Sequence, residues 1–206
     1  MIAQAARAAS ARVIVGGLPG PLDEGRTKLL QSTHLPHWAG RTFQRDLERL
    51  SKASVTLEND SALAALGEAV FGAGRSAAIV AYIGIGTGVG GARIVHGHID
   101  ANASGFEPGH HIIDWQKRHH RHPSPHPGDW ESFVSGSAVL LLTGRTSERV
   151  RGKHFWKNLE KLVAVGLVNV SMFWSPEVIV LGGSLMKRLT LVGVQKAFRV
   201  RQRIFR

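Results

Sequence analysis

Cysteine is absent from this sequence of 206 residues, and long apolar runs are absent as well. Without cysteine there is no disulfide scaffold, no thiol nucleophile and no thiolate metal site. No apolar run reaches the roughly 18 residues that a membrane-spanning helix needs. The N-terminal segment carries Arg7 and Arg12 inside its apolar stretch, which is unlike a secretory signal. We therefore expect a cytoplasmic protein with no membrane association.

Acidic residues are scarce, and the charge imbalance is concentrated at one end of the chain. Lysine and arginine number 26 against 15 acidic residues, a formal net charge of +11. Seven of these cations lie in segment 187–206, which has no acidic residue, so 19 cations face 15 acids elsewhere. A net charge of +11 suggests a polyanionic partner. No RNA-binding motif, zinc finger or helix-turn-helix pattern accompanies the basic segment, so nucleic acid is not an expected partner.

Strand and helix patterns are mixed along the chain and partly alternate. Apolar runs predict strands over 12–18, 54–57, 77–85, 92–96 and 178–181. Helical spacing predicts helices over 41–52, 61–71, 131–143 and 154–173, and residues 1–12 resemble the end of another helix. Residues 100–130 are rich in His, Pro and Gly and are expected to form a loop. This mixture is typical of an α/β fold.

The strand expected at 77–85 runs into a glycine-rich segment, GIGTGVGG (84–91). Successive glycine N–H groups can form a nest that binds phosphate, and Thr87 adds a hydroxyl. No Gly-Lys-Ser/Thr follows, and a second strand comes next, so this is neither a Walker loop nor a Rossmann fingerprint. A glycine-rich hairpin turn without a ligand is the alternative.

A carboxylate stands at the end of the strand expected at 54–57. In Glu58-Asn59-Asp60, the Asp60 carboxylate could accept a proton from a substrate hydroxyl. The alternative is that Asn59 or Asp60 only caps the helix that follows. One helix and one strand separate Asp60 from the glycine-rich segment, so the two could face one cleft.

A second polar cluster surrounds a Pro-Gly turn. Glu107 and His110 bracket this turn, and Glu131 follows later in the chain. Carboxylates and an imidazole suit a polyhydroxylated ligand such as a sugar, because hydroxyl groups need paired donors and acceptors. An ordinary polar surface loop is the alternative. Trp130, beside Glu131, either lines this cleft or packs in the core.

Several segments together resemble the repressor–ORF–kinase (ROK) family of bacterial sugar kinases and sugar-responsive repressors. The resemblance runs in order from about residue 13 to 188. It rests on VGGLPGPLDEG (15–25), LPHWAG (35–40), LENDSALAALGEAVFGAGR (57–75), YIGIGTGVGGARIVHGHI (82–99), GFEPGHHIID (105–114), WESFVSGSA (130–138) and SPEVIVLGGS (175–184).

The resemblance implies a role for each matching residue. Asp60 matches the family's catalytic base, and the residues that match the sugar ligands are Asn59, Glu107, His110 and Glu131. The residues that match the loop around the ATP phosphates are Gly86, Thr87, Gly88, Gly90 and Gly91, and those that begin the adenosine-contacting segment are Gly182 and Gly183. The implied cofactor is ATP with Mg²⁺.

The implied fold is α/β and actin/hexokinase-like, with two ribonuclease-H-like lobes around a cleft. We expect residues 1–76 to form a partial N-terminal lobe and residues 77–206 a C-terminal lobe ending in the basic tail 187–206. The family's opening Asp-x-Gly-Gly-Thr loop has no counterpart here, and Leu189–Arg206 does not resemble the family's ending. The expectation is a first lobe that is incomplete and a chain that is truncated at both ends.

Many ROK proteins bind a structural zinc through the histidine that matches His110 and three cysteines. The cysteines are missing here, but His120, His122 and Asp129 stand near their places, with His119 and His126 as substitutes. Histidine and carboxylate are zinc ligands, so a cysteine-free site with His110 is one interpretation. Loss of the metal is the other.

The function implied is ATP-dependent phosphorylation of a hexose or N-acetylhexosamine, with Asp60 as the general base. The alternative is a non-catalytic sugar-binding relic or gene fragment that lacks the first phosphate loop. Family repressors carry an N-terminal helix-turn-helix that has no counterpart in this sequence, so a role on DNA is not expected. Because family members often form dimers, a homodimer is a further expectation.

Overall fold

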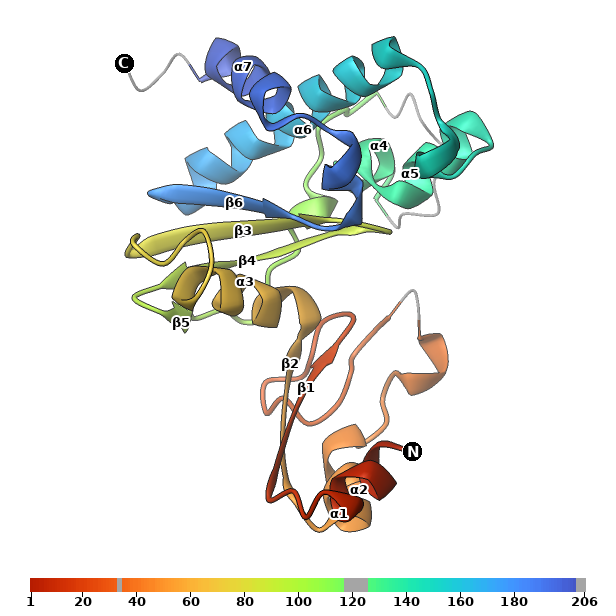
Figure 1. The fold of residues 1–206 in the computed structure, drawn as a ribbon, viewed down its shortest axis with the longest axis vertical. Coiled ribbons are helices and arrows are strands. Elements are labelled where there is room, and N and C mark those ends of the chain that lie inside the picture. Colours follow the sequence, from red (N-terminus) through yellow and green to blue (C-terminus); the bar gives the residue numbers. More distant parts are fainter. Residues whose placement is uncertain (33–34, 117–125, 203–206) are drawn as a thin grey trace.

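The computed structural model describes residues 1–32, 35–116 and 126–202. It is a mixed α/β structure in which two sheets share the chain (Figure 1). Residues 1–59, the small unit, carry the first sheet, and residues 60–202, the large unit, carry the second. Among the described residues, no helix combines the length and the apolar character needed to cross a membrane.

The small unit is built on two parallel strands, β1 (Val13–Leu18) and β2 (Ser54–Asn59). Helices α1 (Ile2–Ala8) and α2 (Phe43–Ser51) pack together at the end of this unit farthest from the large sheet (Figure 1). A short 3₁₀ turn, η1 (Pro36–Trp38), precedes α2. The core of the unit is formed by six buried side chains, Leu18, Leu22, Leu29, Leu47, Val55 and Leu57. The register places Leu18 opposite Asn59, so both strands end together.

The large unit is built on a sheet of order β5-β4-β3-β6. Its strands are β3 (Ile79–Ile85), β4 (Val89–Val95), β5 (His98–Ile99) and β6 (Val178–Gly182). β3 and β4 form an antiparallel hairpin, and β6 runs parallel to β3 with Gly84 opposite Gly182. The carboxyl ends of β3 and β6 therefore meet at one edge of the sheet, the usual ligand-binding edge of an α/β sheet.

Helices cover both faces of this sheet (Figure 1). α3 (Asp60–Val70) covers one face through alanines at helical spacing, which pack on Val80 and Tyr82. α6 (Lys153–Trp174) covers the other face, where the alternate strand residues Ala81, Ile83 and Ile85 point. The remaining helices and turns are η2 (Pro108–His110), α4 (Glu131–Val134), α5 (Gly136–Thr143), η3 (Ser147–Arg149), η4 (Ser184–Arg188) and α7 (Leu191–Arg201).

Most predicted elements are present, and three differ. The helix expected over 131–143 is two helices, because Ser135 leaves the helical conformation and caps α5 by accepting the Ala138 N–H at 3.0 Å. The second strand of the hairpin begins at Val89, earlier than the predicted 92. The sequence predicted no helix in the basic tail, whereas the structure has α7 there, which packs on α6 and buries Val194.

The predicted lobe boundary at residue 76 places α3 in the first lobe. In the structure, α3 packs against β3 and β4 of the large sheet, and its buried alanines belong to that core. The division of the chain into lobes stays a prediction. For the site, the important point is that Asp60 lies where β2 passes into α3.

Candidate functional site

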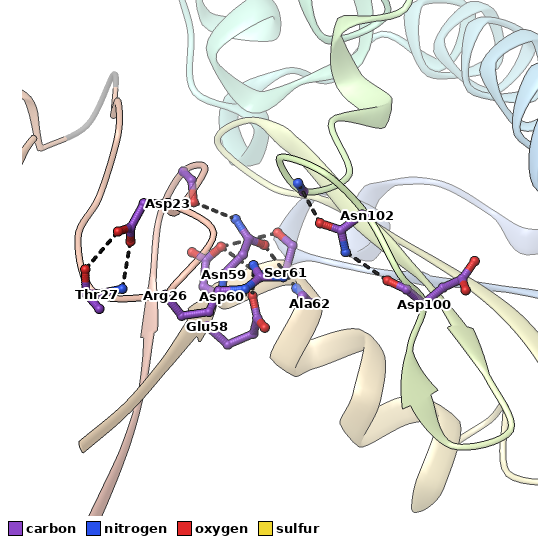
Figure 2. Close-up of polar contacts among 12 residues, drawn as sticks. Asp23, Arg26, Thr27, Glu58, Asn59, Asp60, Ser61, Ala62, Asp100 and Asn102 are labelled. Atoms are coloured by element: carbon purple, nitrogen blue, oxygen red, sulfur yellow. Dashed lines mark hydrogen bonds and ion pairs between the residues drawn. The ribbon is translucent and has the colours of Figure 1, made fainter. Parts of the chain in front are cut away.

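The junction between β2 and α3 holds Asn59 and Asp60 (Figure 2). Asn59 is the N-cap of α3: its side-chain oxygen accepts the Ala62 N–H at 3.0 Å, and its amide nitrogen donates to the Gly20 carbonyl at 3.1 Å. Asp60 is exposed, and its Oδ1 accepts the N–H of Ser61 at 2.7 Å. The capping interpretation is therefore correct for Asn59, which leaves the Asp60 carboxylate as the group that can meet a ligand.

An ion pair that the sequence did not predict stabilises the junction between β2 and α3. Arg26, from a turn of the small unit, lies 2.8 Å from Glu58 through Nη1 and Oε1 (Figure 2). The same Glu58 oxygen accepts the Asn59 N–H at 2.8 Å. The turn itself is closed by Asp23, which accepts the N–H groups of Thr27 and Lys28. Because 32 positions separate Arg26 from Glu58, no local spacing reveals the pair.

Glu107 and His110 flank η2, which rests against the start of β4. Gly109 permits this contact, because a side chain there would overlap the Val89 carbonyl. Burial raises the pKa of Glu107, and the negative charges of Glu131 and Asp60 raise it further, while His110 acts in the opposite direction. Because charges act on one another over short distances, Glu107, His110, Glu131 and Asp60 lie near one another. That they form one sugar pocket, together with Asn59, stays a prediction.

Glu131 connects this space to the glycine turn. Its Oε2 accepts the Val89 N–H at 2.6 Å. A Cβ atom on Gly88 would lie 2.6 Å from the same oxygen, so only glycine fits beside this carboxylate without a shift. One residue therefore borders both the predicted sugar pocket and the predicted phosphate loop.

The glycine turn is residues 86–88, between β3 and β4. The Gly86 N–H donates to the Gly88 carbonyl at 2.9 Å. The start of α5 holds the turn from behind: the Gly86 carbonyl accepts the Gly136 N–H at 2.7 Å, and the Thr87 carbonyl accepts the Ser137 hydroxyl at 2.7 Å. Within the described part of the chain, the N–H groups of Thr87 and Gly88 have no protein acceptor. They are the donors that an anion could use.

Gly90 and Gly91 lie in β4 and not in the turn. A side chain on Gly90 would overlap the Ser61 hydroxyl of α3, and one on Gly91 would overlap the Tyr82 carbonyl. Both glycines therefore allow close packing around the sheet. Their assignment to the phosphate loop stays a prediction that this placement does not support.

Gly182 is the last residue of β6, and Gly183 follows it, beside the glycine turn. Gly183 has a φ of +91°, and a side chain there would overlap the Ile85 carbonyl at the end of β3. A Cβ on Gly86 would lie 3.7 Å from the hydroxyl of Ser184. The two segments that the sequence assigns to the nucleotide are thus neighbours at one edge of the sheet.

The expected zinc ligands are only partly within the described residues. His110 and Asp129 come together, but through a hydrogen bond between Nδ1 and Oδ2 of 2.8 Å. The His126 ring lies 5.7 Å from that of His110. His119, His120 and His122 lie outside the described residues. In the described ranges, no group of three or more potential ligands is arranged to hold a metal. The zinc interpretation therefore stays a prediction, because two of its four ligands, His120 and His122, lie outside the described residues.

Trp130 packs in the core and does not line the cleft. Its side chain is fully buried, and its indole N–H donates to the Leu162 carbonyl of α6 at 3.1 Å. The indole covers Gly166 of the same helix. Trp130 thus anchors the start of α4 to α6. This contact fixes the backbone position of the next residue, Glu131.

A sequence model of the ROK family matches residues 1–202. The chain belongs to the ROK family. The match includes α7 and most of the basic tail, so the expectation that the resemblance ends near residue 188 was wrong. It also starts at residue 1, ahead of the expected residue 13.

Curated ROK relatives include both kinases and repressors. The chain is 29% identical over 182 residues to a putative fructokinase of Bacillus subtilis, covering 82% of this chain and 59% of the relative. It is 25% identical over 205 residues to a xylose repressor of the same organism, covering 91% and 52%. The chain thus spans little more than half the length of these relatives.

Solved ROK structures share the fold. The ROK hexokinase of Thermus thermophilus has a TM-score of 0.80 at 23% identity, covering 96% of this chain and 74% of that one. The glucokinase of Streptomyces griseus, in complex with glucose and AMPPNP, has a TM-score of 0.73 at 24% identity, covering 89% and 70%. These likenesses confirm the predicted α/β fold of the actin/hexokinase-like class.

Proposed function

We propose that this ROK protein phosphorylates a hexose or N-acetylhexosamine with ATP, using Asp60 as the general base. The observation that carries the proposal is the position of Glu131. The negative charge of its carboxylate raises the pKa of Glu107 and that of His110. The same carboxylate accepts the Val89 N–H beside the glycine turn. A sugar held by Glu107 and His110 would therefore lie next to a terminal phosphate held by the glycine turn. Named ROK relatives include a glucokinase and an N-acetyl-D-glucosamine kinase.

Each residue has a distinct task in this mechanism. Asp60 accepts the proton of the attacking hydroxyl, and Glu107 and Glu131 accept hydrogen bonds from other hydroxyls of the sugar. Asn59 keeps one amide hydrogen for the sugar, since the other donates to Gly20. The N–H groups of Thr87 and Gly88 donate to the phosphates. Mg²⁺ arrives with the nucleotide and neutralises phosphate charge, so the protein contributes mainly positioning and electrostatics.

A coupled assay for ADP tests the proposal. The purified chain is incubated with Mg·ATP and a panel of hexoses and N-acetylhexosamines, one at a time. We expect ADP release that depends on one sugar class. If the protein is folded by circular dichroism and releases no ADP with any sugar, the proposed activity is wrong for this chain.

The alternative is sugar binding without transfer. It is favoured by one observation: the sequence in hand contains no Asp-x-Gly-Gly-Thr segment, the first phosphate loop that the family resemblance implies. In this case a sugar raises the melting temperature while ADP release stays at background. Running both assays on one preparation separates the two functions.

Glu107 should make sugar binding depend on pH. Because burial raises its pKa, the carboxylate becomes protonated at a higher pH than an ordinary glutamate and loses an acceptor. We expect sugar affinity to fall as the pH drops through this raised pKa. Glu107→Gln should weaken binding about tenfold at neutral pH, which is the size of one hydrogen bond to a charged group, and should flatten the profile.

Isothermal titration with the sugar found in the ADP assay measures both effects. Glu177→Gln is the matched control, because Glu177 lies at the opposite edge of the sheet, where β6 begins. A Glu107→Gln protein that keeps the wild-type affinity and pH profile would show that Glu107 does not contact the sugar.

A further inference from the structure

His110 is held by a buried aspartate. The Nδ1 atom of His110 lies 2.8 Å from Oδ2 of Asp129, and Asp129 has no exposed surface. Only the imidazole remains partly open, with 29% of its side-chain surface exposed. The hydrogen bond to Asp129 is the main cause of the raised pKa of His110. The ring is thus fixed at one nitrogen and partly exposed, and the carboxylates of Glu131 and Glu107 lie near it.

Asp129 is itself fixed from the other side. Its Oδ1 accepts the Ser132 N–H at 2.9 Å, and its carbonyl accepts the Ser132 hydroxyl at 2.7 Å. The two carboxylate oxygens therefore have separate tasks, one at the start of α4 and one at His110. Through Asp129, the orientation of the His110 ring therefore depends on the position of α4, the helix that carries Glu131.

The distances are those of a hydrogen bond and not of a shared metal. Two ligands of a tetrahedral zinc, each about 2.0–2.1 Å from the ion, lie about 3.3 Å apart. The 2.8 Å between Nδ1 and Oδ2 is a normal length for a charge-assisted hydrogen bond. The carboxylate thus satisfies Nδ1, so a metal bound through that nitrogen would have to displace this hydrogen bond.

We propose that Asp129 is a positioning residue that orients His110 for the sugar, by a hydrogen bond in the place of a metal. A carboxylate bonded to Nδ1 fixes the proton on that nitrogen and directs Nε2 to the ligand. The kinetic consequence rests on the proposed function, whereas the state of the imidazole does not. The proposal predicts that the protein needs no zinc for sugar binding.

Kinetics of two variants test the positioning role. Asp129→Ala removes the acceptor, so we expect the sugar KM to rise about tenfold or more while the KM for ATP stays unchanged. Asp129→Asn keeps one acceptor oxygen and should recover part of that loss. Asp114→Asn is the matched control, because Asp114 is also a buried aspartate of the same region, and its Oδ1 accepts the Gln116 N–H at 3.1 Å. A folded Asp129→Ala protein with an unchanged sugar KM would overturn the proposal.

Nuclear magnetic resonance of ¹⁵N-histidine decides the question even if the protein has no kinase activity. His110→Gln identifies the His110 signal among the 11 histidines. We expect a protonated Nδ1 with a downfield, slowly exchanging proton in the wild type, and its loss in Asp129→Ala. Elemental analysis accompanies the spectra. Stoichiometric zinc that is lost in Asp129→Ala, or a His110 signal that the substitution leaves unchanged, would contradict the proposal.

Discussion

Asp60→Asn should abolish sugar-dependent ADP release while leaving sugar binding nearly intact. Asparagine has almost the same shape, but it cannot take up the proton of the attacking hydroxyl. General-base catalysis contributes about 10²–10⁴-fold, so we expect kcat to fall by at least about 100-fold. The sugar KM should change little, because Glu107, His110 and Glu131 remain in place. Steady-state kinetics with the sugar identified in the ADP assay measures both constants.

The matched control for this prediction is Asp46→Asn. Asp46 is an exposed aspartate of α2, in the small unit and away from the junction of β2 with α3. It should keep the wild-type kcat. If Asp60→Asn retains kcat within about threefold of wild type, Asp60 is not the base and the mechanism proposed here fails at its central step.

Gly166→Ala should destabilise the protein, although alanine is the better helix former. Residue 166 lies inside α6, where replacing glycine normally gains about 0.5–1 kcal/mol. Here a Cβ would overlap the indole of Trp130, which is fully buried and bonded to the Leu162 carbonyl. Overpacking of this kind costs about 1–3 kcal/mol or more, so the steric term should exceed the helical gain. We expect the free energy of unfolding to fall by about 1–2 kcal/mol.

Gly67→Ala is the control with the opposite sign. Gly67 lies in α3, and a Cβ there would meet nothing within 4 Å. This variant should gain about 0.5–1 kcal/mol. Urea unfolding of both variants measures the difference. A Gly166→Ala protein as stable as wild type would mean that Trp130 does not pack against α6 in solution, and the position of Glu131 would then lack its anchor.

The regular parts of the fold were predictable because their patterns are local. The apolar run before GIGTGVGG predicted β3, and helical spacing predicted α3 and α6. The order of the ROK-like segments predicted the fold class. The helix break at Ser135 was missed, because Ser-Gly-Ser between apolar residues fits both a helix and a cap. It is decided by contacts with the glycine turn, where Gly136 and Ser137 bond the Gly86 and Thr87 carbonyls.

Helix α7 shows the limit of composition as a guide. Its many cations contributed to the suggestion of a polyanionic partner and predicted no helix, yet Thr190 caps the helix by accepting the Gly193 N–H at 3.1 Å. Glu160 of α6 in turn accepts the N–H and the hydroxyl of Thr190, at 2.9 and 2.6 Å. These partners are 30 residues apart, so only packing on α6 reveals them.

The sequence by itself determined that this cysteine-free protein has an α/β fold and which polar residues were candidates for its site, because strand and helix periods and the ROK-like segments are contiguous in the chain. Only the tertiary structure decided that Asp60, Glu107, His110 and Glu131 lie near one another, and that Asp129 bonds His110. Such contacts depend on how separate elements pack. The absence of cysteine excluded a thiolate site at once, but the choice of a buried carboxylate as the partner of His110 required Asp129, just before α4, to lie against η2.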